Sequence, residues 1–264
     1  MIRKLRWVSF AILLVPVLIS IGMAGDPPVS ISGKEGAPAV SQDKTTEVEA
    51  YKGGKIEYDA FEWNFGYAPA NSTVKHTYLI KNTGTDTLRI TNVKPSCGCT
   101  SAPLLKDVLG PGESTGLEVG FKTLKFIGEV KKDVRITSSD PNGSSSKIVF
   151  SANISNPHPA LRVDPEIIDF VQIPIGQKSK LVTKLTNISN SDLTLVTIDS
   201  PNKDYLEYKF KRDTLKPNQS TELEVRISEK APVGILQESI TLDVKPLTNA
   251  RLSIPIRGEI IPGR

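Results

Sequence analysis

The reactive side chains of this sequence are concentrated in Cys97 and Cys99. They are its only cysteines, and one glycine separates them in the run 94–100, Lys-Pro-Ser-Cys-Gly-Cys-Thr. Thiols two positions apart can close a small disulfide, bind a soft metal ion, or exchange electrons with a partner dithiol. They can also be part of a shaped turn that has no chemical role. The spacing alone leaves these four alternatives open.

A disulfide between Cys97 and Cys99 would close a loop of three residues. The two α-carbons must then approach within about 4.4–6.8 Å, and Gly98 permits the sharp turn that this requires. For so short a loop the chain-entropy relation gives about 1.5 kcal/mol, against about 4–5 kcal/mol for a loop of a hundred residues. We therefore expect a local bond that adds little stability and is reduced more readily than a structural bridge.

Metal binding would need further ligands around the two sulfurs. Cys97 and Cys99 are the candidate ligands for Cu(I) or Zn(II), but two thiolates do not complete a tetrahedral shell. The chain has no methionine after Met23, and its only histidines are His76 and His158. We predict no bound cofactor.

Disulfide exchange would instead need a lowered thiol pKa. Lys94 and Lys106 are the nearest cations in the sequence, which is a weak cue. His76 is not expected to serve the thiols, because it occupies a strand position equivalent to Leu181. We predict a core histidine that is hydrogen-bonded to the backbone.

No other residues form a recognisable catalytic motif. The sequence lacks a Gly-x-Ser-x-Gly elbow, a phosphate-binding glycine-rich loop and a His-Glu-x-x-His motif. An activated serine needs a histidine base and an acid that orients it, and this chain has only two histidines to act as that base. We predict that the protein is not an enzyme and has no small-molecule substrate. Phe61, Trp63 and Phe65 are predicted to fill a core rather than to stack on a ligand.

The net charge of +4 comes mostly from the N-terminal segment. Without Arg3, Lys4 and Arg6, the 33 basic side chains become 30, against 29 acidic ones. A chain with nearly equal numbers of basic and acidic side chains has no excess positive charge to attract a polyanion, so we predict no nucleic-acid partner.

Residues 1–24 have the layout of a secretory signal peptide. Basic residues precede an uncharged run over 7–21, and small residues surround a cleavage point after Ala24. The alternative is an uncleaved anchor, although the run is shorter than the roughly 20 residues that span a bilayer; membrane association is expected only in that case. Residues 25–55 are predicted to be a disordered tether. Export would place the protein in the periplasm, the cell envelope or outside the cell, where disulfides persist.

From residue 56 onward the chain repeats itself about 105 residues later. Phe65 precedes Asn82 by 17 residues, and Phe170 precedes Asn187 by the same 17. Between them, residues alternate with the period of a strand that has one buried face. Asn, Asp, Gly and Ser after each strand are typical of turns.

A second match joins residues 109–119 to residues 215–225. In each segment a proline presets φ, and the next residue, Gly112 or Asn218, tolerates positive φ. We therefore predict type II turns that lead into strands.

Short alternating strands without a helical period predict an all-β protein with two tandem immunoglobulin-like β-sandwiches. The prolines in Asn156-Pro-His-Pro159 interrupt the pattern, because proline cannot donate to a strand ladder. The predicted domains are 56–156, which carries the Cys-Gly-Cys motif, and 160–264.

Several motifs of the first repeat resemble a known bacterial family. They are Phe61-Glu-Trp-Asn-Phe-Gly66, His76-Thr-Tyr78, Asn82-Thr-Gly84, Pro95-Ser-Cys-Gly-Cys-Thr100 and Leu109-Gly-Pro-Gly-Glu-Ser114. They are similar to domain-of-unknown-function family 1573, which is related to the Hydin-like (ASH) immunoglobulin-like domains. The resemblance covers about residues 57–155, and the second repeat looks like a diverged copy with Ser-Pro-Asn-Lys-Asp at 200–204 in place of the thiols. It implies a fold and an exported location, but no reaction.

These observations predict an exported, non-catalytic cell-envelope protein that acts as an interaction or structural module. Its partner would be an unidentified envelope protein, bound at sheet edges or at the loops of a sandwich. The loop of Cys97 and Cys99 is expected at one end of the first domain. The alternative function is metal binding or disulfide exchange through these two thiols.

Overall fold

The structure is a computed structural model that describes residues 53–263. The predicted signal peptide (1–24) and nearly all of the predicted tether (25–55) lie outside the described residues. Every regular element in the described part is a strand, and none of it is a helix able to cross a membrane. The predicted all-β class, with two immunoglobulin-like domains in tandem, is confirmed.

The first domain contains nine strands in two sheets. One sheet has the order β1-β3-β7-β5, and the strands in the order β2-β9-β8-β4-β6 are the first-domain part of a ten-stranded sheet that continues into the second domain. The strands are β1 (Ile56–Tyr58), β2 (Glu62–Ala68), β3 (Thr73–Asn82), β4 (Leu88–Pro95), β5 (Thr100–Ser101), β6 (Val108–Leu109), β7 (Ser114–Lys122), β8 (Gly128–Ser138) and β9 (Ser145–Ile154).

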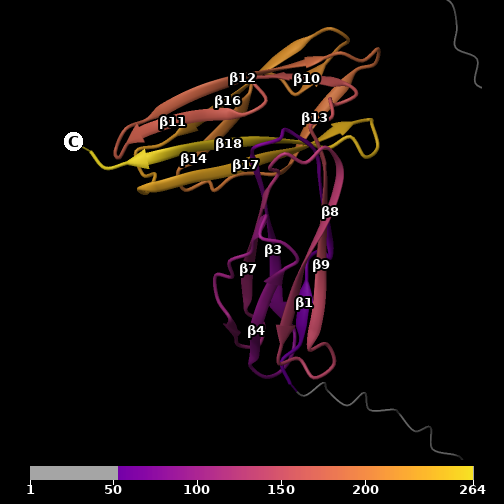
Figure 1. Cartoon of the computed structure of the whole chain (residues 1–264), viewed down its shortest axis with the longest axis vertical. Helices are drawn as coiled ribbons and strands as arrows, with labels where there is room; N and C mark the ends of the chain where they lie inside the picture. The colour runs from indigo at the N-terminus through magenta and orange to yellow at the C-terminus, as the bar shows by residue number, and fades with distance from the viewer. Residues whose placement is uncertain (1–52, 264) are drawn as a thin grey trace, which may run out of the picture. The chain divides into compact units, whose positions relative to one another are not determined.

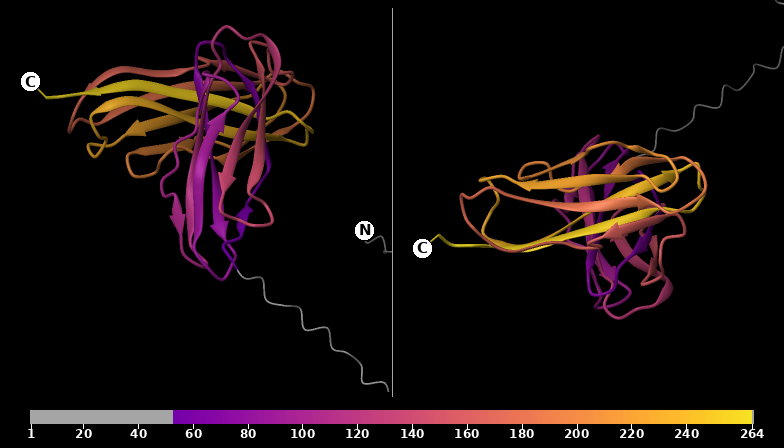
Figure 2. Two further views of the ribbon diagram at one scale, coloured as in Figure 1. Left: turned by 60° about the horizontal axis from the view of Figure 1, so that its bottom comes forward. Right: turned by 90° about the horizontal axis from the view of Figure 1, so that it is seen from above.

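The second domain repeats this arrangement. One sheet has the order β10-β12-β16-β14, and the other has the order β15-β13-β17-β18 with β11 beside β18. Figure 1 labels most of the strands, and Figure 2 gives two further views. The strands are β10 (Leu161–Asp164), β11 (Ile168–Pro174), β12 (Ser179–Asn187), β13 (Leu193–Asp199), β14 (Leu206–Phe210), β15 (Thr214–Leu215), β16 (Ser220–Ile227), β17 (Gly234–Lys245) and β18 (Leu252–Ile261).

Each domain has its own hydrophobic core. In the first, Phe65, Tyr78 and Phe150 are at most 1% exposed and lie in one cluster, as the alternating pattern predicts. The second core forms a separate cluster in which residues of both of its sheets meet. Phe61 is an exception to the prediction, because 55% of it is exposed where it precedes β2.

A buried asparagine closes the same turn in both domains. Asn82 is fully buried, and its Nδ2 donates to the carbonyl oxygens of Asp86 and Leu109. Asn187 does the same to Ser191 and Leu215. These bonds tie the end of a strand to two loops, which explains why the repeat keeps an asparagine there.

The two predicted type II turns are present. Gly112 has φ of 79° and Asn218 has φ of 62°, the positive values that the third turn position requires. In each turn the next amide donates back to a carbonyl three residues earlier, from Glu113 to Gly110 and from Gln219 to Lys216.

Candidate functional site

Cys97 and Cys99 lie where the chain crosses from one sheet of the first domain to the other. β4 belongs to one sheet and β5 to the other, and only residues 96–99 connect them. We expected this loop at one end of the sandwich. Pro95 pairs with Val134 in the middle of β8, where the crossover begins, and Thr100 pairs with Phe121 near the end of β7, where it finishes.

The two sulfurs are joined in a disulfide, with the α-carbons 5.2 Å apart. Cys99 is buried at 8% exposure, whereas Cys97 is half-buried and Gly98 is exposed. A Cβ built on Gly98 would contact nothing within 4 Å, so the loop is open to the outside at its tip.

The hydroxyl of Thr100 lies against both sulfurs. Its Oγ1 is 3.4 Å from Sγ of Cys97 and 4.0 Å from Sγ of Cys99. Thr100 is itself only 8% exposed. Within residues 53–263 these sulfurs are the sole hydrogen-bond partners of this buried hydroxyl.

The groups that sequence reasoning considered as helpers do not surround the thiols. Over residues 53–263, no three His, Cys, Asp or Glu side chains are close enough together to hold a metal ion. The ammonium of Lys106 is 2.6 Å from Oε2 of Glu113, and this hydrogen bond lowers the pKa of Glu113. Lys106 is therefore paired with a carboxylate rather than aimed at sulfur.

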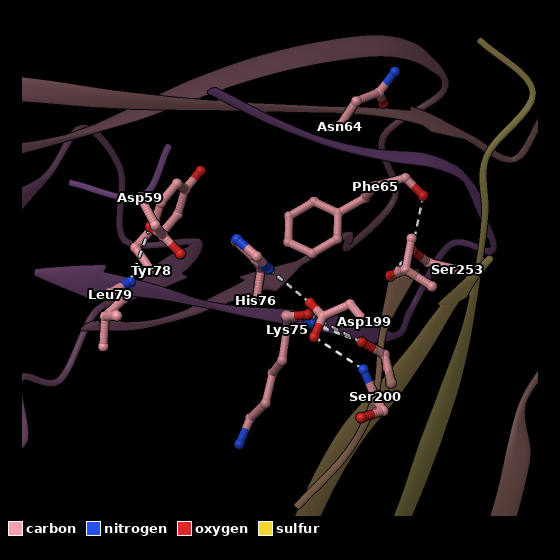
Figure 3. Close-up of polar contacts among 12 residues, drawn as sticks. Asp59, Asn64, Phe65, Lys75, His76, Tyr78, Leu79, Asp199, Ser200 and Ser253 are labelled. Atoms are coloured by element: carbon pink, nitrogen blue, oxygen red, sulfur yellow. Dashed lines mark hydrogen bonds and ion pairs between the residues drawn. The ribbon is translucent and has the colours of Figure 1, made fainter. Parts of the chain in front are cut away.

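His76 corrects the expectation of a core histidine bonded to the backbone. Its Nδ1 is 2.7 Å from Oδ2 of Asp199, at the end of β13 in the second domain (Figure 3). Its ring stacks on that of Trp63, with centroids 3.6 Å apart and planes 3° from parallel. The histidine therefore joins the two domains.

Trp63 also contacts a side chain of the second domain. The guanidinium of Arg251 lies 5.0 Å from the centroid of its ring, and Nε of Arg251 is 3.0 Å from Oδ1 of Asp243. Burial alone would raise the pKa of Asp243, but the hydrogen bonds and charges of Lys245 and Arg251 together lower it. The indole N–H of Trp63 has no hydrogen-bond partner in the described part of the chain. Trp63 thus contributes to the junction through its ring.

Backbone pairing also joins the domains. The amide of Tyr67 in β2 donates to the carbonyl of Arg251 over 2.9 Å, and Leu252 at the start of β18 pairs in parallel with Tyr67. Oγ of Ser253 donates to the carbonyl of Phe65 over 2.7 Å (Figure 3). The second domain thereby adds the end of a strand to the edge of the first.

Gly66 is what lets the two backbones approach. It has φ of 70°, and a Cβ built there would lie 2.0 Å from the carbonyl oxygen of Arg251. It sits in a bulge of β2, between Asn64 and Tyr67, where the register with β9 shifts. Oδ1 of Asn64 accepts the amide of Gly66 over 2.8 Å and closes the bulge.

Lys75 makes a further polar contact across the junction. Its amide donates to Oγ of Ser239 over 2.9 Å, and its ammonium lies 3.6 Å from Oε1 of Glu238. Tyr205 donates its hydroxyl to the same Glu238 oxygen over 2.9 Å. Burial first, and the Glu238 charge second, raise the pKa of Tyr205, so this hydroxyl keeps its proton.

His158, in the segment between the domains, is a buried neutral histidine. Its Nδ1 accepts the amides of Ala160 and Leu161, and its Nε2 donates to the carbonyl of Ala250 over 3.0 Å. Burial lowers the pKa of His158, an effect that the bond to Ala250 partly offsets. These contacts use both ring nitrogens, so the histidine serves the fold.

The bulge of β2 has a counterpart in β11 of the second domain. There the register with β18 shifts between Asp169 and Gln172, and Oδ1 of Asp169 accepts the amide of Val171 over 2.9 Å. Val171 occupies the place of Gly66 and also has positive φ, 55°. Val171 is 70% exposed, however, and β18 is the only described strand that pairs with β11.

Comparison with known families supports the assignment of both domains. Residues 56–154 match the model of a protein family of unknown function, DUF1573, and residues 159–259 match the HYDIN/CFA65/VesB-like Ig-like domain. The resemblance predicted from the sequence is confirmed. The Ig-like fold of both domains fits the coarse prediction of a binding or structural module.

Similar solved structures are distant. A protein of unknown function from Porphyromonas gingivalis W83 is 13% identical over 78% of this chain and 99% of its own, with a TM-score of 0.34. The VesB protease of Vibrio cholerae is 20% identical over 38% of this chain and 32% of its own, with a TM-score of 0.31. The ASH/PapD-like domain of human CEP192 is 13% identical over 42% of this chain and 92% of its own, with a TM-score of 0.32.

No curated protein matches the chain by sequence. The chain spans about a third of the VesB chain, 32%. At these identities and scores, the solved structures support no inference about activity.

Proposed function

We propose that this chain is an exported, non-catalytic binding module of the cell envelope, and that the edge of β11 is where it binds its partner. One observation carries the proposal. The same bulged edge occurs in both domains, and in the first domain it already holds another strand. In the second domain the equivalent edge is free among the described residues.

The chemistry of this edge fits an extended protein segment. In β2, the amide of Tyr67 points outward and donates to a backbone carbonyl. Its counterpart in β11 is Gln172. Tyr67 pairs with Asn153 of the parallel strand β9, and Gln172 pairs with Glu259, the equivalent residue of the parallel strand β18. A segment that adds beside β11 would take this amide, and its side chains would cover Val171.

The conformation of Val171 supports a role at this position. A β-branched residue at φ of 55° is a genuine outlier, and such strained residues concentrate at functional positions. A large apolar side chain that is 70% exposed adds a surface whose burial favours association.

A photo-crosslinking amino acid at Val171 tests the proposal in intact cells. Val182 is the matched control, since it is an exposed valine that lies in a regular part of β12 and pairs with Glu224 of β16. We expect one discrete envelope-protein adduct from position 171 and none from position 182. Equal adducts from both positions, or none from position 171, would exclude this edge as the binding surface.

Export is tested separately, by the N-terminus of the mature protein. The expected result is a chain that begins at Gly25 in the periplasmic or extracellular fraction. A cytoplasmic chain that retains Met1 would contradict export. The crosslinking experiment would then still test the β11 edge independently.

A further inference from the structure

We propose that Cys97 and Cys99 form a thiol–disulfide exchange site that reacts stoichiometrically with a dithiol partner, a redox role in addition to the non-catalytic binding role proposed above. The proposal does not depend on the β11 edge. It rests on three features of the crossover between β4 and β5: unequal exposure of the two sulfurs, a buried hydroxyl held against both, and anchoring of the loop that does not involve the bond.

The unequal exposure assigns the order of the steps. Cys97 is half-buried beside the open tip at Gly98, whereas Cys99 is 8% exposed. An incoming thiolate therefore attacks Sγ of Cys97. A mixed disulfide forms, the Cys97–Cys99 bond breaks, and its electron pair leaves on Sγ of Cys99.

The second thiol of the dithiol then completes the exchange. It attacks its own sulfur in the mixed disulfide, and Cys97 leaves as a thiolate. The dithiol is oxidised to a disulfide and has given up two electrons and, to the solvent, two protons. Cys97 and Cys99 have gained these two electrons and take up two protons from solvent, so that electrons and protons balance. In the reverse sequence, the disulfide of the partner oxidises the Cys97 and Cys99 thiols and is itself reduced to the dithiol.

The Thr100 hydroxyl is placed to assist both steps. It is 3.4 Å from one sulfur and 4.0 Å from the other, and it can rotate to donate to whichever sulfur becomes a thiolate. A hydrogen bond to a charged acceptor is worth more than one to a neutral disulfide sulfur. The hydroxyl therefore stabilises the thiolate that forms in each step more than it stabilises the disulfide, which lowers the barrier to exchange.

Two exposed lysines flank the loop along the backbone, and Asp133 contacts it at Ser96. Lys94 lies three positions before Cys97, and the amide of Lys122 donates to the carbonyl of Cys99 over 2.8 Å. Both side chains are exposed, and neither has an ion-pair partner among residues 53–263. Cations near a sulfur favour its thiolate form and attract an anionic thiolate.

Hydrogen bonds that do not involve the disulfide also hold the loop. Ser96 and Asp133 exchange two hydrogen bonds, of 2.9 Å and 3.1 Å, that tie one side of the crossover to β8. The bond between Lys122 and Cys99 ties the other side to β7. Since closure of three residues contributes little chain entropy, reduction should leave the first domain folded.

The experiment measures the rate at which reduced dithiothreitol opens the disulfide in the full-length mature chain, by thiol labelling and mass spectrometry. Thr100→Val keeps the shape and removes the hydroxyl, whereas Thr100→Ser keeps the hydroxyl. We expect wild type to be reduced without denaturant, Thr100→Val to react about tenfold more slowly, and Thr100→Ser to stay within about twofold of wild type.

Circular dichroism during the reaction separates exchange from unfolding. We expect the strand signal and the thermal midpoint of each reduced variant to stay close to those of its oxidised form. Reduction that proceeds only at denaturant concentrations that unfold the domain would overturn the proposal, as would equal rates for wild type and Thr100→Val. Either result would leave the disulfide as a fixed part of the turn.

Discussion

Nδ1 of His76, in the first domain, lies 2.7 Å from Oδ2 of Asp199, in the second. Asp199 ends β13, where the second domain begins the crossover that corresponds to the Cys-Gly-Cys crossover of the first. The same topological position therefore serves two purposes. In one domain it carries a disulfide, and in the other it supplies a carboxylate to the domain junction.

The pair of His76 and Asp199 should contribute measurably to stability. We expect Asp199→Ala to lower the free energy of unfolding by about 1–3 kcal/mol, because the half-buried imidazole loses its partner. Asp204→Ala, in the same loop but exposed, is the control and should change it by less than about 0.5 kcal/mol. Urea denaturation measures both. A double-mutant cycle with His76→Ala then isolates the pair, and a coupling energy of zero would show that the contact is incidental.

Gly66→Ala should disrupt the junction. The new Cβ would fall 2.0 Å from the carbonyl oxygen of Arg251, which immediately precedes β18 and is hydrogen-bonded to Tyr67 of β2. Gly128→Ala is the matched control, because Gly128 also has positive φ, 80°, but open space around it. We expect Gly128→Ala to cost about 1 kcal/mol and Gly66→Ala clearly more, as measured by thermal and urea unfolding. Similar losses would mean that the backbones separate easily here.

Stability should fall as the pH drops below about 6.5, and His158 should be one cause. Burial lowers its pKa in the folded protein, so in this window the unfolded chain binds a proton that the folded chain does not. The free energy of unfolding therefore decreases with falling pH and stops responding to His158 below its folded pKa. Urea midpoints between pH 7.5 and 5 measure the slope. The slope should be shallower in His158→Asn, and an identical slope in that variant would rule out His158 as a source.

Val171→Gly should separate stability from binding. Glycine accepts φ of 55° without strain, so we expect the thermal midpoint to rise or remain equal. Val182→Gly, in a regular strand, should lower it because glycine weakens strand interiors. Crosslinking from the adjacent Gln172 in the Val171→Gly background should weaken, since the exposed apolar side chain is gone. An undiminished adduct would show that Val171 does not contact the partner.

Much of the fold could be predicted from the sequence, because its determinants are local and occur twice. The asparagines at 82 and 187 and the turns at Gly112 and Asn218 act through their own neighbourhoods, and a repeat of about 105 residues makes them visible. The disulfide spacing was visible because both cysteines lie in one short motif, although the second repeat lacks them. The buried hydroxyl of Thr100 was part of the motif, but its contacts with both sulfurs depend on the folded crossover.

The domain junction could not be predicted, because its contacts join residues that are far apart in the sequence and belong to different domains. His76 and Asp199 are 123 positions apart and share no periodic pattern. One signal was present and missed. The repeat aligns Gly66 with Val171. A glycine inside a strand often marks a bulge or a close approach of two backbones, and the valine at the equivalent position of the second repeat made Gly66 stand out.

Hydrogen exchange at two backbone amides of the purified protein shows whether the β11 edge is free. If the two domains carry the same edge, one occupied and one free, then Tyr67 should be strongly protected because its amide donates to Arg251. Its counterpart Gln172 should exchange quickly. Rapid exchange at Tyr67 would contradict the occupied edge, and strong protection at Gln172 in the isolated protein would contradict the free one.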